Sequence, residues 1–207
     1  DRALELEPGN ARVVSTAGMV DFYIVGDQQR GVELMRRAVS LDPVRLAGHN
    51  NLGWSLMRTG QLDESWASFE TARTLSVDPS WTEGPFGLLL LLQGDAAAAL
   101  ERMQKVQGNL GLAGQAVAYS ALGQKQQSDE LLRKLETIEG GPDNVLIAMA
   151  HAYRGEHDEA LHWLEIAYRE HSSDLVEIRG QPLLKNLESR NPATLENPFF
   201  RMVPEPL

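Results

Sequence analysis

Cysteine is absent from the 207-residue chain. This absence excludes disulfide bonds and metal sites built from thiolates. Long hydrophobic runs are also missing, because the longest, Phe86 to Leu92, is far shorter than the roughly 20 apolar residues that a membrane-spanning helix requires. The sequence therefore predicts a protein that does not insert into a membrane and is not stabilised by covalent cross-links.

Basic residues are outnumbered by acidic ones. Lysine and arginine together number 19 against 29 aspartates and glutamates, which gives a formal net charge of -10. An acidic chain is repelled by the phosphate backbone of nucleic acids and by the headgroups of anionic membranes. We therefore expect no direct nucleic-acid partner.

The sequence also lacks the patterns that accompany catalysis or cofactor binding. It has no glycine-rich phosphate loop and no serine or cysteine nucleophile pattern. His157 and His162 are five positions apart, which places them about 140° apart on a helix, so they cannot share a metal ion on one face. At His151, between helices, a hydrogen-bonded core histidine is favoured over a ligand. We predict a non-enzyme with no catalytic residue, no metal and no cofactor.

The sequence does contain a recurring glycine. From Asn51 to Ala72, apolar side chains at helical spacing precede Gly60 and others follow it. This pattern predicts two amphipathic helices joined by a tight turn, because glycine readily takes the positive φ that ends one helix and lets the chain reverse. Equivalent glycines occur at Gly26, Gly60, Gly94, Gly123 and Gly155. Their separations of 34, 34, 29 and 32 residues indicate a repeat.

Side chains of matched size surround each of these glycines. Five positions after the glycine the residue is small, namely Gly31, Ser65, Ala99, Ser128 or Ala160. Nine positions after it the residue is large and apolar, namely Met35, Phe69, Met103, Leu132 or Leu164. A small residue lets two helix backbones approach, and a large one fills the space beside it. Since one helix pair cannot bury its apolar face alone, we expect the pairs to stack.

This register resembles that of the tetratricopeptide repeat (TPR) family. The match is strongest in residues 46–74, where Leu52, Gly53, Gly60, Phe69 and Ala72 agree with the family pattern. The resemblance implies an all-α fold, a right-handed α-solenoid of helix pairs with a C-terminal capping helix. It assigns residues 1–9 to a half repeat, 11–171 to five repeats, 172–190 to the capping helix and 191–207 to an irregular tail.

The two ends of the array carry separate expectations. Residues 1–9 read as the end of a second helix whose first helix is missing, so we expect the chain to begin inside an earlier repeat of a longer protein. A natural N-terminal capping helix is the alternative. Near the other end, Leu175, Ile178 and Leu184 are expected to pack against the second helix of the fifth repeat, Glu156 to Tyr168.

The resemblance also implies a binding surface, because the first helices of TPR pairs line a concave groove. The corresponding candidate peptide-binding residues here are Val20, Tyr23, Asn50, Trp54, Met57, Arg58, Leu88 and Leu91. Most of them are apolar, so we predict a groove that binds an apolar or amphipathic protein segment. The basic residues that would clamp a terminal carboxylate are lacking on the neighbouring first helices.

The function implied by the resemblance is that of a protein- or peptide-binding scaffold. The alternative is a structural or self-associating array, such as a homodimer, whose groove is filled by its own chain or by a second copy. The run AYRGEHDEALHWLEIAY followed by DLVEIRGQPLLKNL also resembles the C-terminal TPR module of bacterial multidomain signalling proteins. This implies a module of a larger regulatory protein, with the cytoplasm favoured and the periplasm open if that protein is membrane-tethered.

Overall fold

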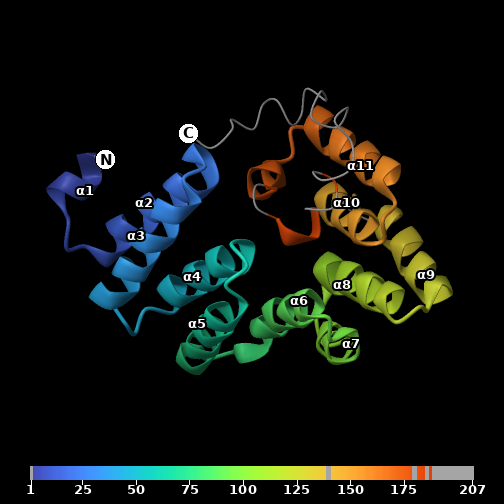
Figure 1. Cartoon of the computed structure of the whole chain (residues 1–207), viewed down its shortest axis with the longest axis horizontal. Helices are drawn as coiled ribbons and strands as arrows, with labels where there is room; N and C mark the ends of the chain where they lie inside the picture. Colours follow the sequence, from blue (N-terminus) through green and yellow to red (C-terminus); the bar gives the residue numbers. More distant parts are fainter. Residues whose placement is uncertain (1, 139–140, 179–180, 185–186, 188–207) are drawn as a thin grey trace. The chain divides into compact units, whose positions relative to one another are not determined.

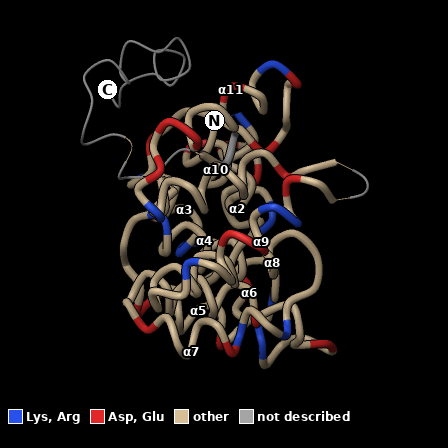
Figure 2. Tube along the Cα trace, turned by 90° about the vertical axis from the view of Figure 1, so that its right-hand side faces the viewer, with Lys and Arg blue, Asp and Glu red and all other residues tan. Residues whose placement is uncertain are grey.

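The computed structural model describes residues 2–138, 141–178, 181–184 and 187, and every regular element in this part of the chain is a helix (Figure 1). The chain forms two compact units, the first reaching to Thr82 and the second beginning at Glu83. Within the described ranges, no helix is long and apolar enough to cross a membrane. Acidic and basic residues are interspersed along the helices of both units (Figure 2).

The first unit contains two helix pairs preceded by a short helix. Its elements are α1 (Arg2–Leu6), α2 (Ala11–Met19), the π-helix η1 (Val20–Val25), α3 (Gln28–Leu41), α4 (Leu46–Arg58), α5 (Leu62–Leu75) and the 3-10 helix η2 (Pro79–Thr82). Helix α2 runs directly into η1, and both pack on α3, while α4 packs on α5. Phe22, Met35 and Leu56 are almost completely buried in one apolar cluster that joins the two pairs.

The second unit contains three helix pairs followed by two short helices. Its elements are α6 (Glu83–Gln93), α7 (Ala96–Met103), α8 (Gly108–Ala121), α9 (Lys125–Glu136), α10 (Asn144–Tyr153), α11 (His157–Arg169) and the 3-10 helices η3 (Ser173–Glu177) and η4 (Pro182–Leu184). The pairs are α6 with α7, α8 with α9 and α10 with α11. The first helices also contact one another, α6 with α8 and α8 with α10, so they form a layer of their own.

The predicted turn glycines all lie between the helices of a pair. Gly26, Gly60, Gly94, Gly123 and Gly155 have φ angles between 74° and 92°, which confirms the prediction of positive φ. After four of them, the next residue's N–H donates to a carbonyl five positions earlier, as in the 2.9 Å bond from Gln61 to Leu56. This is the Schellman arrangement, in which the glycine ends the helix while its last carbonyls keep their partners.

The small residues after each turn glycine are buried, as the sequence predicted. In two repeats this residue is a serine that also forms an equivalent hydrogen bond. Ser65 Oγ donates to the Gly53 carbonyl at 2.7 Å, and Ser128 Oγ donates to the Ala116 carbonyl at 2.7 Å. Each bond joins the second helix of a pair to the first, so the small side chain both permits the close approach and fixes it.

The first helix of the first pair contains one residue more than its counterparts. Three equivalent glycines show this, because an added Cβ would meet the large residue of the same pair: Gly18 with Met35 at 3.0 Å, Gly53 with Phe69 at 2.8 Å and Gly87 with Met103 at 2.9 Å. Gly18 precedes its turn glycine by eight positions, whereas Gly53 and Gly87 precede theirs by seven. The π-helix η1 takes up the extra residue, since its hydrogen bonds span five positions instead of four.

The C-terminal segment differs from the single capping helix that the sequence predicted for residues 172–190. Its described part forms the two 3-10 helices η3 and η4 instead. Pro182 begins η4 and has no N–H to donate, which accounts for the interruption. Helix η4 packs mainly on α10, the first helix of the fifth pair, instead of on the predicted second helix. The predicted irregular tail, 191–207, lies outside the described residues.

Candidate functional site

The predicted groove residues of the first unit lie at very different depths. Val20 on η1 is 45% exposed, whereas Met57 and Arg58 on α4 are only 3% and 4% exposed. Tyr23, Asn50 and Trp54 are half-buried. Met57 and Arg58 therefore offer little free surface, and Val20 offers the most of these residues.

Two of the half-buried residues are held by contacts inside the first unit. The Trp54 ring meets the Phe69 ring edge-on, with centroids 5.4 Å apart, so it packs within its own helix pair. The Arg58 guanidinium lies over the Tyr23 ring at 5.1 Å, a cation–π contact that links α4 to η1. These contacts fix the walls of the surface and leave its accessible apolar part on η1.

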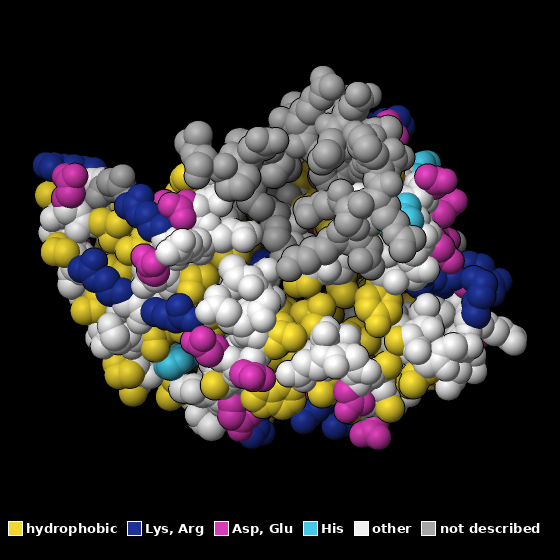
Figure 3. Space-filling view, viewed as in Figure 1, with side chains coloured by type: hydrophobic (Ala, Val, Ile, Leu, Met, Phe, Trp, Pro, Cys, Tyr) yellow, Lys and Arg dark blue, Asp and Glu magenta, His cyan; other side chains and the backbone are white. Residues whose placement is uncertain are grey.

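The accessible apolar side chains of η1 form a small patch with the end of α2. Met19, Val20, Ile24 and Val25 are all exposed, and Ile24 reaches 61%. Hydrophobic side chains lie among charged ones over the N-terminal helices in Figure 3. Because the extra residue of η1 shifts the register, Val20 does not occupy the position equivalent to Trp54, which the spacing from Gly26 had predicted. Met19 takes that position instead.

In the second unit, the first helices enclose an apolar pocket that includes both predicted residues, Leu88 and Leu91. The pocket is lined by Leu88, Leu91, Leu110, Ala113, Gly114, Val117, Leu146, Met149, Ala150 and Leu183. All but Leu183 come from α6, α8 and α10, so side chains of three successive pairs converge here. Its void measures about 10 Å³, close to the space of one water molecule, and its apolar walls give a water no partner.

Leu183 enters this pocket from η4. Leu183 and Leu184 are 6% and 5% exposed, and Leu187 is buried as well. Leu183 thus closes one side of the pocket, and η4 packs on α10. The sequence predicted a covering role for this segment but placed it on the other helix of the pair.

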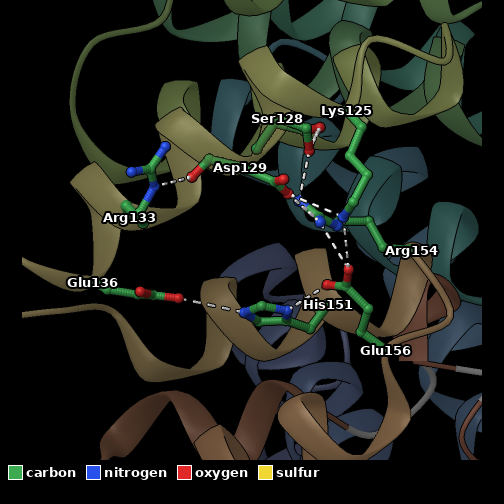
Figure 4. A network of polar contacts seen from close by, with 9 residues as sticks. Lys125, Ser128, Asp129, Arg133, Glu136, His151, Arg154 and Glu156 are labelled. Carbon is green, nitrogen blue, oxygen red and sulfur yellow. Dashed lines mark hydrogen bonds and ion pairs between the residues drawn. The ribbon is translucent and has the colours of Figure 1, made fainter.

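A polar network joins the fourth and fifth pairs (Figure 4). Arg154, whose side chain is almost fully buried, pairs with Asp129 and donates to Glu156 at 2.7 Å and to Ser128 Oγ at 2.9 Å. Lys125 approaches Asp129 and Glu156 to 3.3 Å and 3.6 Å. These contacts connect α9 to the turn that precedes α11, so they stabilise the stacking of one pair on the next.

His151 lies in the same network, between two carboxylates. Its Nδ1 is 2.8 Å from Glu156 Oε2, and its Nε2 is 3.5 Å from Glu136 Oε1. The residue is 8% exposed, which agrees with the predicted core histidine. Among the described residues, no group of three histidine, aspartate or glutamate side chains is arranged to hold a metal ion.

Three charged groups of the network, those of Glu156, Asp129 and Arg154, have shifted pKa values. Burial acts to raise the pKa of Glu156, but hydrogen bonds with His151 and Arg154 outweigh it, and the pKa lies below its ordinary value. The hydrogen bond from Arg154 likewise lowers the pKa of Asp129. Burial acts to lower the pKa of Arg154, but its bonds to Asp129 and Glu156 raise it overall. All three groups are therefore stabilised in their charged forms.

Known structures with the same arrangement of helix pairs exist. Kinesin light chain TPR-like repeats from Podosopora anserina match with a TM-score of 0.53 and 20% sequence identity, over 80% of this chain and 99% of that one. The chain has a TPR-like fold. A tetratricopeptide repeat protein from Parabacteroides merdae matches with a TM-score of 0.51 and 18% identity, over 95% of this chain and 80% of that one. No protein-family model and no curated protein matches the sequence.

Sequence reasoning missed three features of this TPR-like array. Nothing in the glycine spacing reveals the π-helix, because counting from Gly26 assumes a regular helix. Leu183 was expected in a cap and not in the pocket. The two leucines that follow Pro182 do indicate a buried position, but not which helix they contact. The partners of Arg154 could not be paired from sequence, since Asp129 lies in the preceding pair.

Proposed function

We propose that this protein is a protein- or peptide-binding scaffold that uses the surface of its first helices. The observation that carries the proposal is the convergence of apolar side chains from α6, α8 and α10 on one pocket. Packing inside the individual helix pairs does not require this convergence. Apolar surface that gathers outside the pairs is typical of a site for a protein segment.

The eight predicted residues then have two kinds of role. Val20, Tyr23, Asn50 and Trp54 retain accessible surface and would contact a partner, whereas Met57, Arg58, Leu88 and Leu91 are buried and would shape the surface from beneath. The exposed Ile24 joins the first group. We further propose that the scaffold belongs to a larger regulatory or signalling protein, a role supported by the sequence resemblance of the C-terminal run to bacterial signalling modules.

A structural or self-associating array is the second candidate function. It is supported by Leu183, because this residue of the C-terminal segment lines the pocket between the first helices. The molar mass from light scattering tests one difference between the two candidates, namely whether the chain forms a dimer. A concentration-dependent dimer that the groove variants below abolish supports self-association, whereas a monomer with an intact groove supports a separate partner.

The test of the scaffold proposal is peptide selection on the full chain. A random peptide library displayed on phage should yield binders that share apolar residues at a fixed spacing. Val20→Asp and Ile24→Asp place a charge in the exposed patch of η1 and should weaken these binders by about tenfold or more. Because both side chains are exposed, the melting temperature should hardly change.

Val44→Asp is the matched control for these variants. Val44 is 73% exposed and lies in the loop between α3 and α4. The substitution therefore adds the same negative charge outside the first-helix surface. Its binding should equal that of the unmodified chain. If all three variants bind alike, the η1 patch is not part of the binding surface and the assignment of Val20 is wrong.

A further inference from the structure

The pocket of the second unit is built by first helices except at one position. Among the described lining residues, Leu183 is the one that comes from elsewhere, and it lies on η4, a helix of three residues. Every other wall belongs to the repeated part of the fold. Leu183 therefore occupies the place in the groove where a side chain of a bound segment would lie.

The contacts that hold η4 in place are apolar. Among the described residues, the hydrogen bonds of this segment are local: Gln181 N–H donates to Ile178 O at 2.9 Å, and Leu184 N–H donates to Gln181 O at 3.0 Å. No ion pair of a described residue ties Gln181 to Leu184 onto α8 or α10. A short element whose described contacts with its neighbours are apolar can open locally without unfolding the helices beneath it.

The pocket has no room for a second occupant. With Leu183 in place, the void of about 10 Å³ holds about one water-sized sphere, which is too little space for a leucine side chain. A partner that inserts a side chain between α6, α8 and α10 must therefore remove Leu183 first. Binding of the partner and docking of η4 exclude each other.

We propose that η4 is a built-in occupant of the groove, and that the partner is a protein segment carrying a leucine on a short helical turn, which displaces Leu183 from this pocket. The inference rests on the proposed scaffold function and adds to it the chemistry of the partner and a means of regulation. The lining supports a leucine because every lining residue is apolar or glycine. Since docked η4 lowers the population of the open state, it lowers the apparent affinity for the partner in proportion.

The first experiment uses the chain's own segment as the probe. A fluorescent synthetic peptide of residues 181–187, QPLLKNL, is titrated into the full chain and into its Leu183→Asp variant. The variant should bind the peptide at least about tenfold more tightly, because its own η4 no longer competes. A peptide with aspartate in place of the first leucine should bind neither protein.

Equal affinities of the two proteins for the peptide, or no binding by a variant whose circular dichroism shows it to be folded, would overturn the proposal.

A second measurement, thiol labelling, decides between the outcomes if Leu183→Asp does not fold. Because the chain has no cysteine, Leu183→Cys introduces the only thiol. Ala148→Cys is the control, since Ala148 is fully buried on α10 but does not line the pocket.

Thiol labelling in native buffer then reports whether η4 leaves the pocket. The thiol of Leu183→Cys should react much faster than that of Ala148→Cys, and excess QPLLKNL peptide should accelerate the first reaction alone. If both thiols react at the same slow rate and the peptide changes neither, η4 is a permanent part of the core. The proposal then fails, while the outcome of the Val20 and Ile24 experiment on the first unit is unaffected.

Discussion

Gly53 lies where α4 and α5 are too close for a side chain. A Cβ added there would come within 2.8 Å of the Phe69 ring, closer than side-chain carbons approach one another. Gly48 lies on the same helix, but a Cβ at this position would meet only Val39, at an ordinary 3.5 Å. Alanine substitutions at the two glycines therefore distinguish a clash between α4 and α5, expected at Gly53, from the general effect of replacing glycine in a helix, expected at Gly48.

Gly53→Ala should lower the free energy of unfolding by about 1–3 kcal/mol, because the Phe69 ring must move. Gly48→Ala should leave it unchanged or raise it by up to about 1 kcal/mol, because alanine favours the helix. Urea denaturation of the two variants and the unmodified chain measures both effects. Equal stability of the two variants would show that the contact between Gly53 and Phe69 is not tight.

Glu156 links stability to pH. Its pKa in the folded protein lies below the ordinary value, so folding favours the ionised carboxylate. The stability that it contributes is present above the ordinary glutamate pKa and is lost as the pH falls through the lower, folded value. Glu156→Gln removes the charge between His151 and Arg154, and at neutral pH it should cost about 1–3 kcal/mol.

The expected signature is a flatter dependence of stability on pH. Between pH 7 and the acid range, the unmodified chain should lose more of its unfolding free energy than Glu156→Gln does, as followed by urea denaturation at several pH values. Glu159→Gln is the matched control, because Glu159 lies exposed three residues further along, in the first turn of α11. If the two variants show the same pH dependence, the network around Arg154 does not depend on the Glu156 charge.

At the scale of the element, η1 distinguishes the first helix pair from the others. Its extra residue separates the buried Phe22 from Gly18, and it leaves Val20 and Ile24 exposed. Hydrophobic periodicity predicts a helix here but cannot predict a π-turn, because one inserted residue changes the side-chain directions without changing the composition. Counting back from Gly26 therefore aligned Val20 with Trp54, whereas the π-helix places Met19 at that position.

Deleting Val20 should convert η1 into regular α-helix, because it restores the seven-residue spacing between Gly18 and Gly26 that the other repeats have. The free energy of unfolding should change by about 1 kcal/mol or less. Deleting Trp54 from the regular helix α4 is the control, and it should destabilise the fold severely by rotating Gly53 away from Phe69. Circular dichroism and urea denaturation compare the two deletion variants. A similar loss of unfolding free energy in both would mean that Val20 is not an insertion.

At the scale of the whole molecule, the all-α architecture and its helix pairs follow from short-range sequence information. Gly60, Ser65 and Phe69 lie within ten residues of one another, so their spacing is enough to predict the turn and the packing beside it. The pocket around Leu183 and the ion pairs of Arg154 join residues from different pairs. No spacing along the chain encodes those distances, so only the three-dimensional structure reveals them.

The docking of η4 also affects how the protein is made. Helix pairs whose contacts are local can form as the chain leaves the ribosome, starting from the N-terminus. The walls of the second unit's pocket, from Leu88 to Ala150, are complete before Leu183 has been synthesised. The pocket can therefore be closed only after Leu183 has followed its walls out of the ribosome, so closure by η4 is a late step in the folding of the second unit.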